Sequence, residues 1–340
     1  MAKLKTFSGF PVQNLSSDST SVGQIYYNTS SGQFKAVVGD TTGSWSSGGT
    51  MNGAKRTGIG SWGTKSACLA ASGESGPPWI SPTRVELYDG TSWSEIQDVS
   101  TGRYLGASIG QTSTAALFAS GYAPSGYQTA VEQWNGASWS EKAEMNNPSY
   151  SLSGGLGTST SGLAVGGNRN PAVPPSPGAS SSLVESWNGT GWTNIAELNI
   201  GRAGTSAIGA TNTAGITIGG YTSASYSPRY ATNVESWNGA SWTEIAELNT
   251  GRQGGHASGV QALGVFYGGE SSTPVGAKTE YYDGTSWTEL ADMAVSRGGN
   301  VSGTSSSANS AIAFGSPVAS GSTTEEWVKN DLIVKTLTTS

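Results

Sequence analysis

The chain has one cysteine and one histidine among its 340 residues. Because Cys68 has no second cysteine to pair with, an intrachain disulfide is excluded, and its apolar surroundings SACLAAS predict a small buried residue. His256 on its own excludes a copper or zinc site built from several histidines. We therefore expect neither a metal nor another cofactor, and we expect a packed or solvated imidazole.

Charge and long apolar runs are also scarce. Charged residues make up 12% of the chain and the net charge is -6. Since no basic run is present to neutralise phosphates, a nucleic-acid partner is not expected. No stretch approaches the roughly 20 apolar residues that cross a bilayer, and the first residues lack the apolar core of a signal peptide. We therefore expect neither insertion into a membrane nor secretion by means of a signal peptide.

Glycine, by contrast, is abundant. The chain has 50 glycines and many serines and threonines, while 35% of its residues are hydrophobic. Glycine supplies the positive φ that tight turns require, so this composition predicts short strands joined by tight turns around a large core. We expect an all-β protein.

One short phrase, close to small-Gly-x-Ser-Trp, recurs along the chain. The intervals between its tryptophans are 48, 46, 53, 50 and 45 residues. A period near 50 that tolerates insertions indicates one supersecondary unit copied in tandem, so we expect one repeat domain. The recurring tryptophans are Trp45, Trp93, Trp139, Trp192, Trp242 and Trp287.

Two copies of the unit are especially similar. Residues 184–209 and 234–259 agree at 18 of 26 positions. In each copy the segments VESW and WTxIAEL are separated by Asn-Gly and two further residues. Asn and Gly tolerate positive φ, so this pattern predicts a hairpin. The repeated tryptophans are expected to fill the wedge between neighbouring units.

Each unit carries further landmarks in register. An arginine is followed by a small-residue strand, and then by an apolar strand that ends in Gly-Gly or a variant, such as GITIGG or GVFYGG. The third unit has EMNNPSYS where the arginine is expected. With the hairpin, each unit has four strands, the content of one propeller blade. The arginines are Arg56, Arg103, Arg202, Arg252 and Arg297.

This order of landmarks resembles the Kelch repeat over roughly residues 45–335. The resemblance implies a β-propeller, with six blades as the first expectation. The last copy, TEEWVKNDLIVKTL, lacks the second strand of its hairpin. That strand could come from the N-terminal AVVGDTTGSW or from LIVKTL. A seventh blade would require a contribution from the hairpin that is predicted at residues 25–38.

Chemistry-bearing motifs are few. The phrase YDGTSW, at residues 88–93 and 282–287, is similar to the Asp-box turn of sialidases but lacks its leading Ser-x and interchanges with WNGASW. A turn is therefore a better interpretation than a catalytic site. No D-x-D-x-D-G loop is present, and nothing singles out a pair of acids for glycoside hydrolysis. We expect no catalytic residues and no enzymatic activity.

The connections between the Gly-Gly strand and the VExW strand vary most, and they should emerge on one face. They lie at residues 74–84, 122–130, 168–182, 221–233 and 270–279. Long variable loops on a rigid scaffold often carry binding sites, and aromatic and arginine side chains are enriched there. The alternative is that these side chains only pack the loops together. The candidate binding residues are Trp79, Tyr122, Tyr127, Tyr221, Tyr226, Arg229 and Tyr230.

The first residues form a different module. In residues 10–40, GQIYYNTSSGQFKAV predicts a hairpin with a Gly-containing turn. The whole segment resembles the start of many bacteriophage tail-fibre and other virion proteins. We expect residues 1–38 to be an attachment segment and residues 39–340 the propeller.

That second resemblance implies a function. It implies a non-enzymatic structural protein of a phage virion, made in the host cytoplasm. Its propeller would bind a host-surface glycan or protein, or decorate the particle, and it would attach to other virion proteins through its N-terminus, as an oligomer. Two alternatives stay open, a cellular Kelch-type adaptor that binds another protein and an enzyme that acts on polysaccharide.

Overall fold

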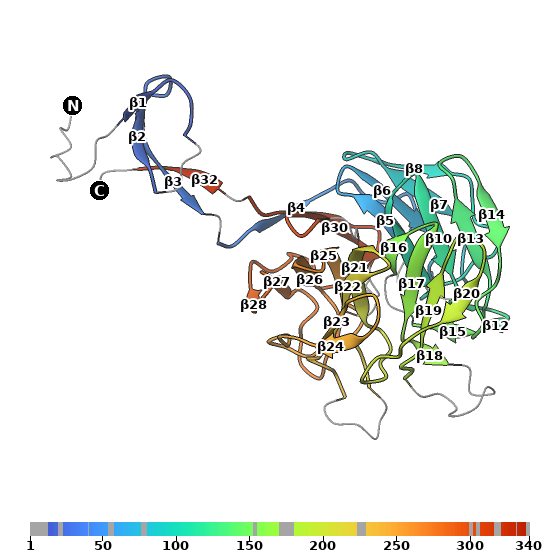
Figure 1. Cartoon of the computed structure of the whole chain (residues 1–340). Coiled ribbons are helices and arrows are strands. Elements are labelled where there is room, and N and C mark those ends of the chain that lie inside the picture. The colour runs from blue at the N-terminus through green and yellow to red at the C-terminus, as the bar shows by residue number, and fades with distance from the viewer. Residues whose placement is uncertain are drawn as a thin grey trace. The chain divides into compact units, whose positions relative to one another are not determined.

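The structure is a computed structural model of the full chain (Figure 1). It describes residues 13–19, 23–39, 41–53, 58–75, 80–151, 155–169, 180–222, 229–298, 302–303, 307–315, 321–330 and 332–337. Every regular element among these residues is a β-strand, which confirms the all-β prediction. The same residues include no helix that is long and apolar enough to span a membrane. The chain divides into two compact units, residues 1–43 with 329–340, and residues 44–328.

The larger unit has six four-stranded antiparallel sheets. Five follow the order of the chain, with strands that match the small-residue, apolar, VExW and Trp segments predicted from each repeat. These are β5 (Gly60–Thr64), β6 (Ala67–Ala71), β7 (Val85–Tyr88) and β8 (Trp93–Ile96); β9 (Ala107–Thr112), β10 (Ala115–Ala119), β13 (Val131–Trp134) and β14 (Trp139–Lys142); β16 (Leu156–Thr158), β17 (Ser161–Val165), β19 (Val184–Trp187) and β20 (Trp192–Asn194); β21 (Ser206–Thr211), β22 (Ala214–Ile218), β23 (Val234–Trp237) and β24 (Trp242–Glu244); and β25 (His256–Val260), β26 (Leu263–Tyr267), β27 (Thr279–Tyr282) and β28 (Trp287–Glu289).

The sixth sheet joins both ends of the repeat region. It consists of β29 (Ser302–Gly303), β30 (Ser310–Phe314), β31 (Thr324–Val328) and β4 (Ser44–Ser47). Strand β4 pairs antiparallel with β31, and Trp45 lies opposite Trp327. Of the two candidate closing strands, the N-terminal one around Trp45 therefore completes the last sheet.

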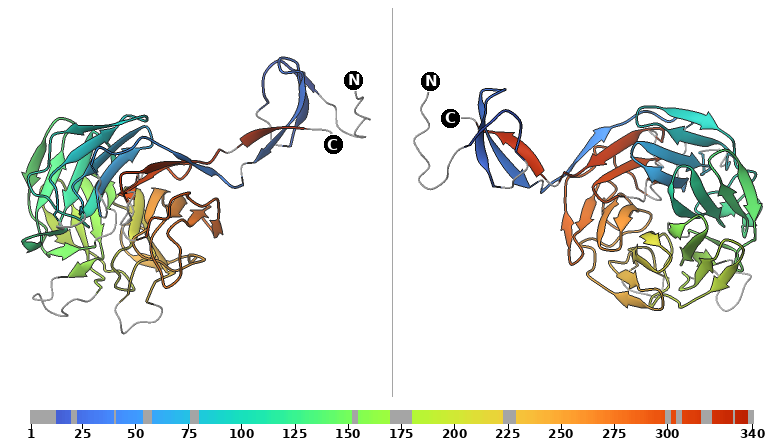
Figure 2. Two further views of the ribbon diagram at one scale, coloured as in Figure 1. Left: turned by 180° about the vertical axis from the view of Figure 1, so that it is seen from behind. Right: turned by 45° about the horizontal axis from the view of Figure 1, so that its top comes forward.

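The first strands of the six sheets form a closed cycle. Strand β5 contacts β9, β9 contacts β16, and the series continues through β21, β25 and β29 back to β5. The right-hand view of Figure 2 shows the sheets of this unit around a common centre. The arrangement is consistent with a β-propeller.

Apolar side chains fill the space between neighbouring sheets. Six buried clusters are present among the described residues, and each joins two adjacent sheets. Trp242 packs on Leu156 and Leu198 of the preceding repeat, and its indole Nε1 donates to the Ala196 carbonyl at 3.1 Å. The prediction that the repeated tryptophans fill these wedges is confirmed at five positions, Trp93, Trp139, Trp192, Trp242 and Trp287, while Trp45 is half-buried.

The smaller unit is one sheet with the order β1-β2-β3-β32, made of β1 (Gln13–Leu15), β2 (Ile25–Asn28), β3 (Gln33–Gly39) and β32 (Leu332–Thr336). Strands β2 and β3 form the predicted hairpin. Strand β32, the LIVKT segment, pairs with β3 and not with the last repeat. The sequence places residues 329–340 in the propeller, whereas in the structure they group with the N-terminal residues, because β4 occupies the edge of β31 and the edge of β3 is available to β32.

The turn between the VExW strand and the Trp strand contains Asp-Gly or Asn-Gly in five of the repeats. In both kinds of turn, the Asp or Asn side chain accepts hydrogen bonds from backbone N–H groups of the turn. Asp283 accepts hydrogen bonds from the backbone N–H groups of Thr285 and Ser286 at 2.8 Å, and Asn238 does the same for Ala240 and Ser241 at 2.9 Å. The Ser286 backbone hydrogen bond, with those from Thr285, lowers the pKa of Asp283 from 3.8 to about 2.

The lowered pKa of Asp283 predicts that the stability of the protein decreases in acid. The folded state holds the Asp283 carboxylate more strongly than the unfolded chain does, so its contribution to stability is present above pH 4 and is lost as the pH falls toward 2. We expect Asp283→Asn to flatten that part of the stability profile and Asn238→Asp to add to it. Urea melts between pH 2 and 6 measure both. Equal profiles for the three proteins would contradict the turn's role.

Candidate functional site

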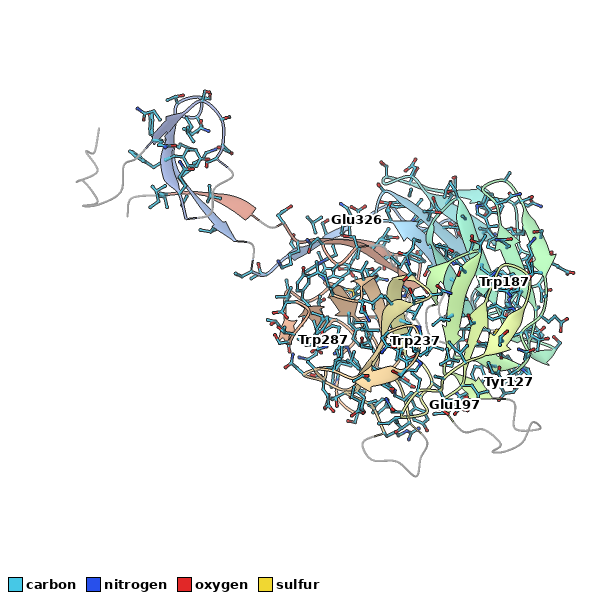
Figure 3. All side chains as sticks on the ribbon, viewed as in Figure 1. Tyr127, Trp187, Glu197, Trp237, Trp287 and Glu326 are labelled. Carbon is cyan, nitrogen blue, oxygen red and sulfur yellow. The ribbon has the colours of Figure 1, made fainter. Side chains whose placement is uncertain are left out.

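Strand direction places the variable loops and the links between sheets at one edge of the larger unit. Because the four strands of each sheet alternate in direction, the second strand and the fourth strand end at the same edge. We call this the connection edge. Tyr127 and Glu197, from a loop and a link, are labelled there in Figure 3.

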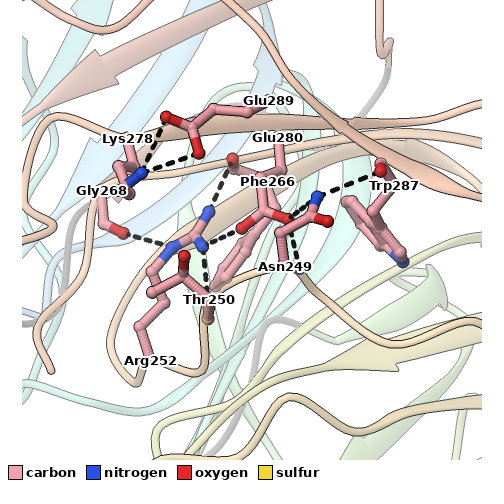
Figure 4. Close-up of polar contacts among 9 residues, drawn as sticks. All are labelled: Asn249, Thr250, Arg252, Phe266, Gly268, Lys278, Glu280, Trp287 and Glu289. Carbon is pink, nitrogen blue, oxygen red and sulfur yellow. Dashed lines mark hydrogen bonds and ion pairs between the residues drawn. The ribbon is translucent and has the colours of Figure 1, made fainter.

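Buried ion pairs fix the backbone at this edge (Figure 4). Arg252 is fully buried and forms an ion pair with Glu280. Its guanidinium also donates to the carbonyls of Thr250 at 3.0 Å and Gly268 at 3.0 Å, and it lies 4.4 Å from the centre of the Phe266 ring. Burial lowers the pKa of this guanidinium, against the opposing effect of Glu280. The equivalent pairs are Arg103 with Glu132, Arg202 with Glu235, and Arg297 with Glu325.

The third repeat, which lacks the arginine, uses amides instead. The Glu185 carboxylate accepts hydrogen bonds from the backbone and side-chain amides of Asn146 and Asn147, at 2.9 to 3.1 Å. The segment EMNNPSYS, which departs from the other repeats, therefore supplies a different partner for the buried glutamate of this sheet. Asn199 and Asn249 bind their glutamates in the way that Asn146 does, so the additional donor in the third repeat is the Asn147 side-chain amide, while Ser149 occupies the position of the arginine.

Four tyrosines gather at the connection edge of the second sheet. Tyr122 and Tyr127 lie opposite each other on a small hairpin, β11 (Tyr122–Ala123) and β12 (Gly126–Tyr127). Tyr150, on β15 (Ser149–Tyr150), contacts both rings, with centroids 5.6 and 5.1 Å away in edge-to-face geometry. The Tyr104 ring lies 5.7 Å from that of Tyr122. We call Tyr104, Tyr122, Tyr127 and Tyr150 the tyrosine cluster.

Backbone pairing brings these tyrosines together. Tyr104 and Tyr122 exchange N–H···O hydrogen bonds of 3.0 and 2.8 Å. The Ser149 carbonyl accepts from the Ser120 hydroxyl at 2.6 Å and from the Gly121 N–H at 3.0 Å. Strand β15 also pairs with β18 (Asn168–Arg169). The sequence predicted Tyr122 and Tyr127 as binding residues. It did not predict Tyr104 and Tyr150, because these two lie in links between sheets and not in the variable loops.

The cluster offers both rings and hydroxyls to a ligand. All four side chains are half-buried, and none of their hydroxyls has a hydrogen-bond partner among the described residues. Burial, with smaller effects of Glu74 and the neighbouring tyrosines, raises the pKa of Tyr104 to about 12, and burial also raises the pKa of Tyr127. The two hydroxyls therefore stay protonated at neutral pH and can donate hydrogen bonds.

Tyr221, Arg229 and Tyr230 form a second group, on the fourth sheet. Tyr221 bridges to both Ala203 and Tyr230 through its backbone. The Arg229 guanidinium carbon lies 4.7 Å from the centre of the Tyr221 ring. Beside them an open cleft of about 640 Å³ reaches the fifth sheet. Its lining residues are Arg229, Tyr230, Thr232, Asn249, Thr250, Gly251, Ser271, Ser272 and Thr273.

The seven candidate residues thus fall into two described groups and a remainder. Tyr122 and Tyr127 belong to the tyrosine cluster on the second sheet. Tyr221, Arg229 and Tyr230 form the group beside the cleft on the fourth sheet. Trp79 and Tyr226 lie outside the described residues.

The structure places the other reactive residues in the interior. Cys68 is fully buried, as expected. His256 lies on the innermost strand β25, and its ring centre is 5.9 Å from that of Tyr267. The residues that the structure describes contain no group of three or more His, Cys, Asp or Glu side chains that could hold a metal ion.

No protein-family model matches the chain, and no curated protein matches it.

Proposed function

We propose that this protein is a structural component of a phage virion, associated with the tail or the capsid, whose repeat unit binds the host surface. In this proposal the six sheets are the blades of a Kelch-like propeller. The order of landmarks in each repeat supports the Kelch assignment, and the closed cycle of first strands supports six blades. The N-terminal segment supports the virion assignment through its resemblance to tail-fibre proteins.

The tyrosine cluster is the observation that carries the binding role. Four half-buried aromatic rings, whose hydroxyls have no partner in the part of the chain that the structure describes, are held by backbone pairing. They give a preorganised surface that stacks on apolar faces and donates hydrogen bonds. Aromatic residues supply much of the affinity at recognition surfaces, and little side-chain entropy is lost when they are already packed. A binding role therefore suits these residues better than catalysis.

The smaller unit suits attachment. Strands from both ends of the chain pair there, so residues 13–39 and β32 form a sheet of their own. In the proposal this unit binds other virion proteins and brings several copies together in the particle. Cryo-electron microscopy of particles whose genome encodes the chain would test this assignment. Density for a six-bladed disc on the tail or capsid is expected, and its absence from every particle would overturn the virion role.

Tyr122→Ala is expected to weaken host-cell binding. Because Tyr122 contacts three other rings, its loss disrupts the whole cluster, and we expect a cost of about 2 kcal/mol, roughly 30-fold in Kd. Titration of labelled protein onto host cells measures this, with a thermal melt to verify folding.

Two further variants sharpen the result. Tyr122→Phe keeps the ring and separates stacking from the hydroxyl. Thr91→Ala changes an exposed turn residue at the opposite edge and should bind like the unaltered protein. If Tyr122→Ala folds and binds host cells as tightly as Thr91→Ala does, the tyrosine cluster is not the binding surface.

A further inference from the structure

The cleft between the fourth and fifth sheets contains an arginine that differs from the others. Arg84, Arg103, Arg202, Arg252 and Arg297 each form an ion pair with a glutamate. Arg229 is exposed and, among the arginines whose side chains the structure describes, it alone has no carboxylate partner. In a chain of net charge -6, an unpaired cation in a cleft attracts an anionic group.

Arg229 is also held in position. Its backbone carbonyl accepts hydrogen bonds from the Thr222 N–H at 3.0 Å and the Thr222 hydroxyl at 3.3 Å, and Thr222 is buried. Its guanidinium lies over the Tyr221 ring at 4.7 Å. A stacked guanidinium keeps its N–H edge free for a planar acceptor, and a carboxylate matches that edge with two parallel hydrogen bonds.

The rest of the cleft is rich in hydroxyls. Thr250, Ser271, Ser272 and Thr273 line it, and their hydroxyls have no hydrogen-bond partner among the described residues. Tyr230 contributes a half-buried aromatic ring. Gly251 also lines the cleft, and a Cβ at this position would come within 2.3 Å of the Tyr230 carbonyl, so a side chain there would displace the backbone of Tyr230.

We propose that this cleft binds an acidic sugar residue of a surface polysaccharide, such as a uronic or sialic acid. Arg229 pairs with the sugar carboxylate, Tyr230 packs against the ring, and the threonine and serine hydroxyls bind the sugar hydroxyls. The mixture of one cation, one aromatic ring and several hydroxyls favours a saccharide over an acidic peptide, because a peptide carboxylate would leave most of these hydroxyls without a partner. This inference rests on the proposed host-binding function and specifies its ligand.

The test uses the full chain and a panel of uronate- and sialate-containing oligosaccharides, each paired with its methyl ester. The ester keeps the sugar and removes the charge. We expect the acids to bind roughly tenfold or more tightly than the esters, since a hydrogen-bonded charge pair accounts for about that factor. Arg229→Gln should abolish the difference, and Arg229→Lys should retain part of it. Arg84→Gln, at a half-buried arginine just before strand β7, is the matched control and should leave the difference unchanged.

Several results would overturn the inference. These are no binding of any acidic oligosaccharide, equal binding of acid and ester, an acid preference that persists in Arg229→Gln, or equally tight and Arg229-dependent binding of a short glutamate peptide. The proposed function fails separately. If the protein binds host cells in a Tyr122-dependent manner while Arg229→Gln has no effect, only this inference is wrong. If it binds neither cells nor saccharides, the host-binding role is wrong as well.

Discussion

Removal of residues 1–47 together with 329–340 is expected to unfold the repeat unit, whereas removal of 1–43 together with 329–340 is expected to leave it folded. The two chains differ by strand β4 (Ser44–Ser47). Without β4 the edge of β31 is unpaired, and the contacts of Trp45 with Trp327 and Tyr267, 5.4 and 5.0 Å between ring centres, are lost. Loss of a fully buried tryptophan costs about 3 to 5 kcal/mol; the half-buried Trp45 contributes less than that, and the lost backbone pairing of β4 adds to it.

The effect should extend beyond one sheet. The sixth sheet also closes the cycle of sheets by contacting the first sheet. The Tyr88 hydroxyl donates to Glu326 at 2.6 Å, and the Trp93 indole donates to Thr324 at 3.1 Å. We therefore expect a total loss of at least about 5 kcal/mol, comparable to the whole stability of many domains. Urea unfolding followed by tryptophan fluorescence compares the two chains. Equal midpoints would mean that β4 does not close the unit.

Glu280→Gln is expected to destabilise the protein by about 3 to 5 kcal/mol, because it leaves the Arg252 guanidinium buried without its counter-charge. Both side chains are fully buried. The same carboxylate accepts from the Asn249 N–H at 2.7 Å and its side-chain amide at 2.9 Å, so the change also loosens the link that lines the cleft.

The adjacent, partly exposed ion pair of Lys278 and Glu289 provides a control. Lys278 and Glu289 lie beside Arg252 in Figure 4, and their side chains are 26% and 47% exposed. Lys278→Met should therefore cost less than about 1 kcal/mol. Chemical denaturation of both variants measures the contrast. If the two variants lose similar stability, the buried pair is not what holds the connection edge together.

The double variant Glu280→Gln with Arg252→Met should recover part of the loss. It removes the uncompensated charge, and the methionine side chain can fill some of the space beside Phe266. A double variant that is less stable than either single variant would show that the arginine stabilises mainly through the carbonyls of Thr250 and Gly268.

The sequence by itself determined the repeat and most of its secondary structure. The Trp phrase, the Asn-Gly and Asp-Gly turns and the apolar strands recur in register, and each depends on local chemistry: turns need positive φ, and strands need alternating or apolar residues. The sequence also predicted the burial of Trp93, Trp139, Trp192, Trp242 and Trp287, because a large side chain repeated at one position of every unit packs between neighbouring units.

Only the tertiary structure decided how the repeats close and which side chains meet. The segments around Trp45 and around Leu332 were both plausible closing strands, and the choice depends on pairing across nearly the whole chain. Arg252 and Glu280 were visible as recurring landmarks, but their pairing was not, because 28 residues separate them. Tyr104 and Tyr150 join Tyr122 only through backbone bonds between links and loops. Long-range contacts of this kind leave no local pattern, so the candidate site could be predicted in part, while its assembly into a tyrosine cluster and a separate cleft came from the fold.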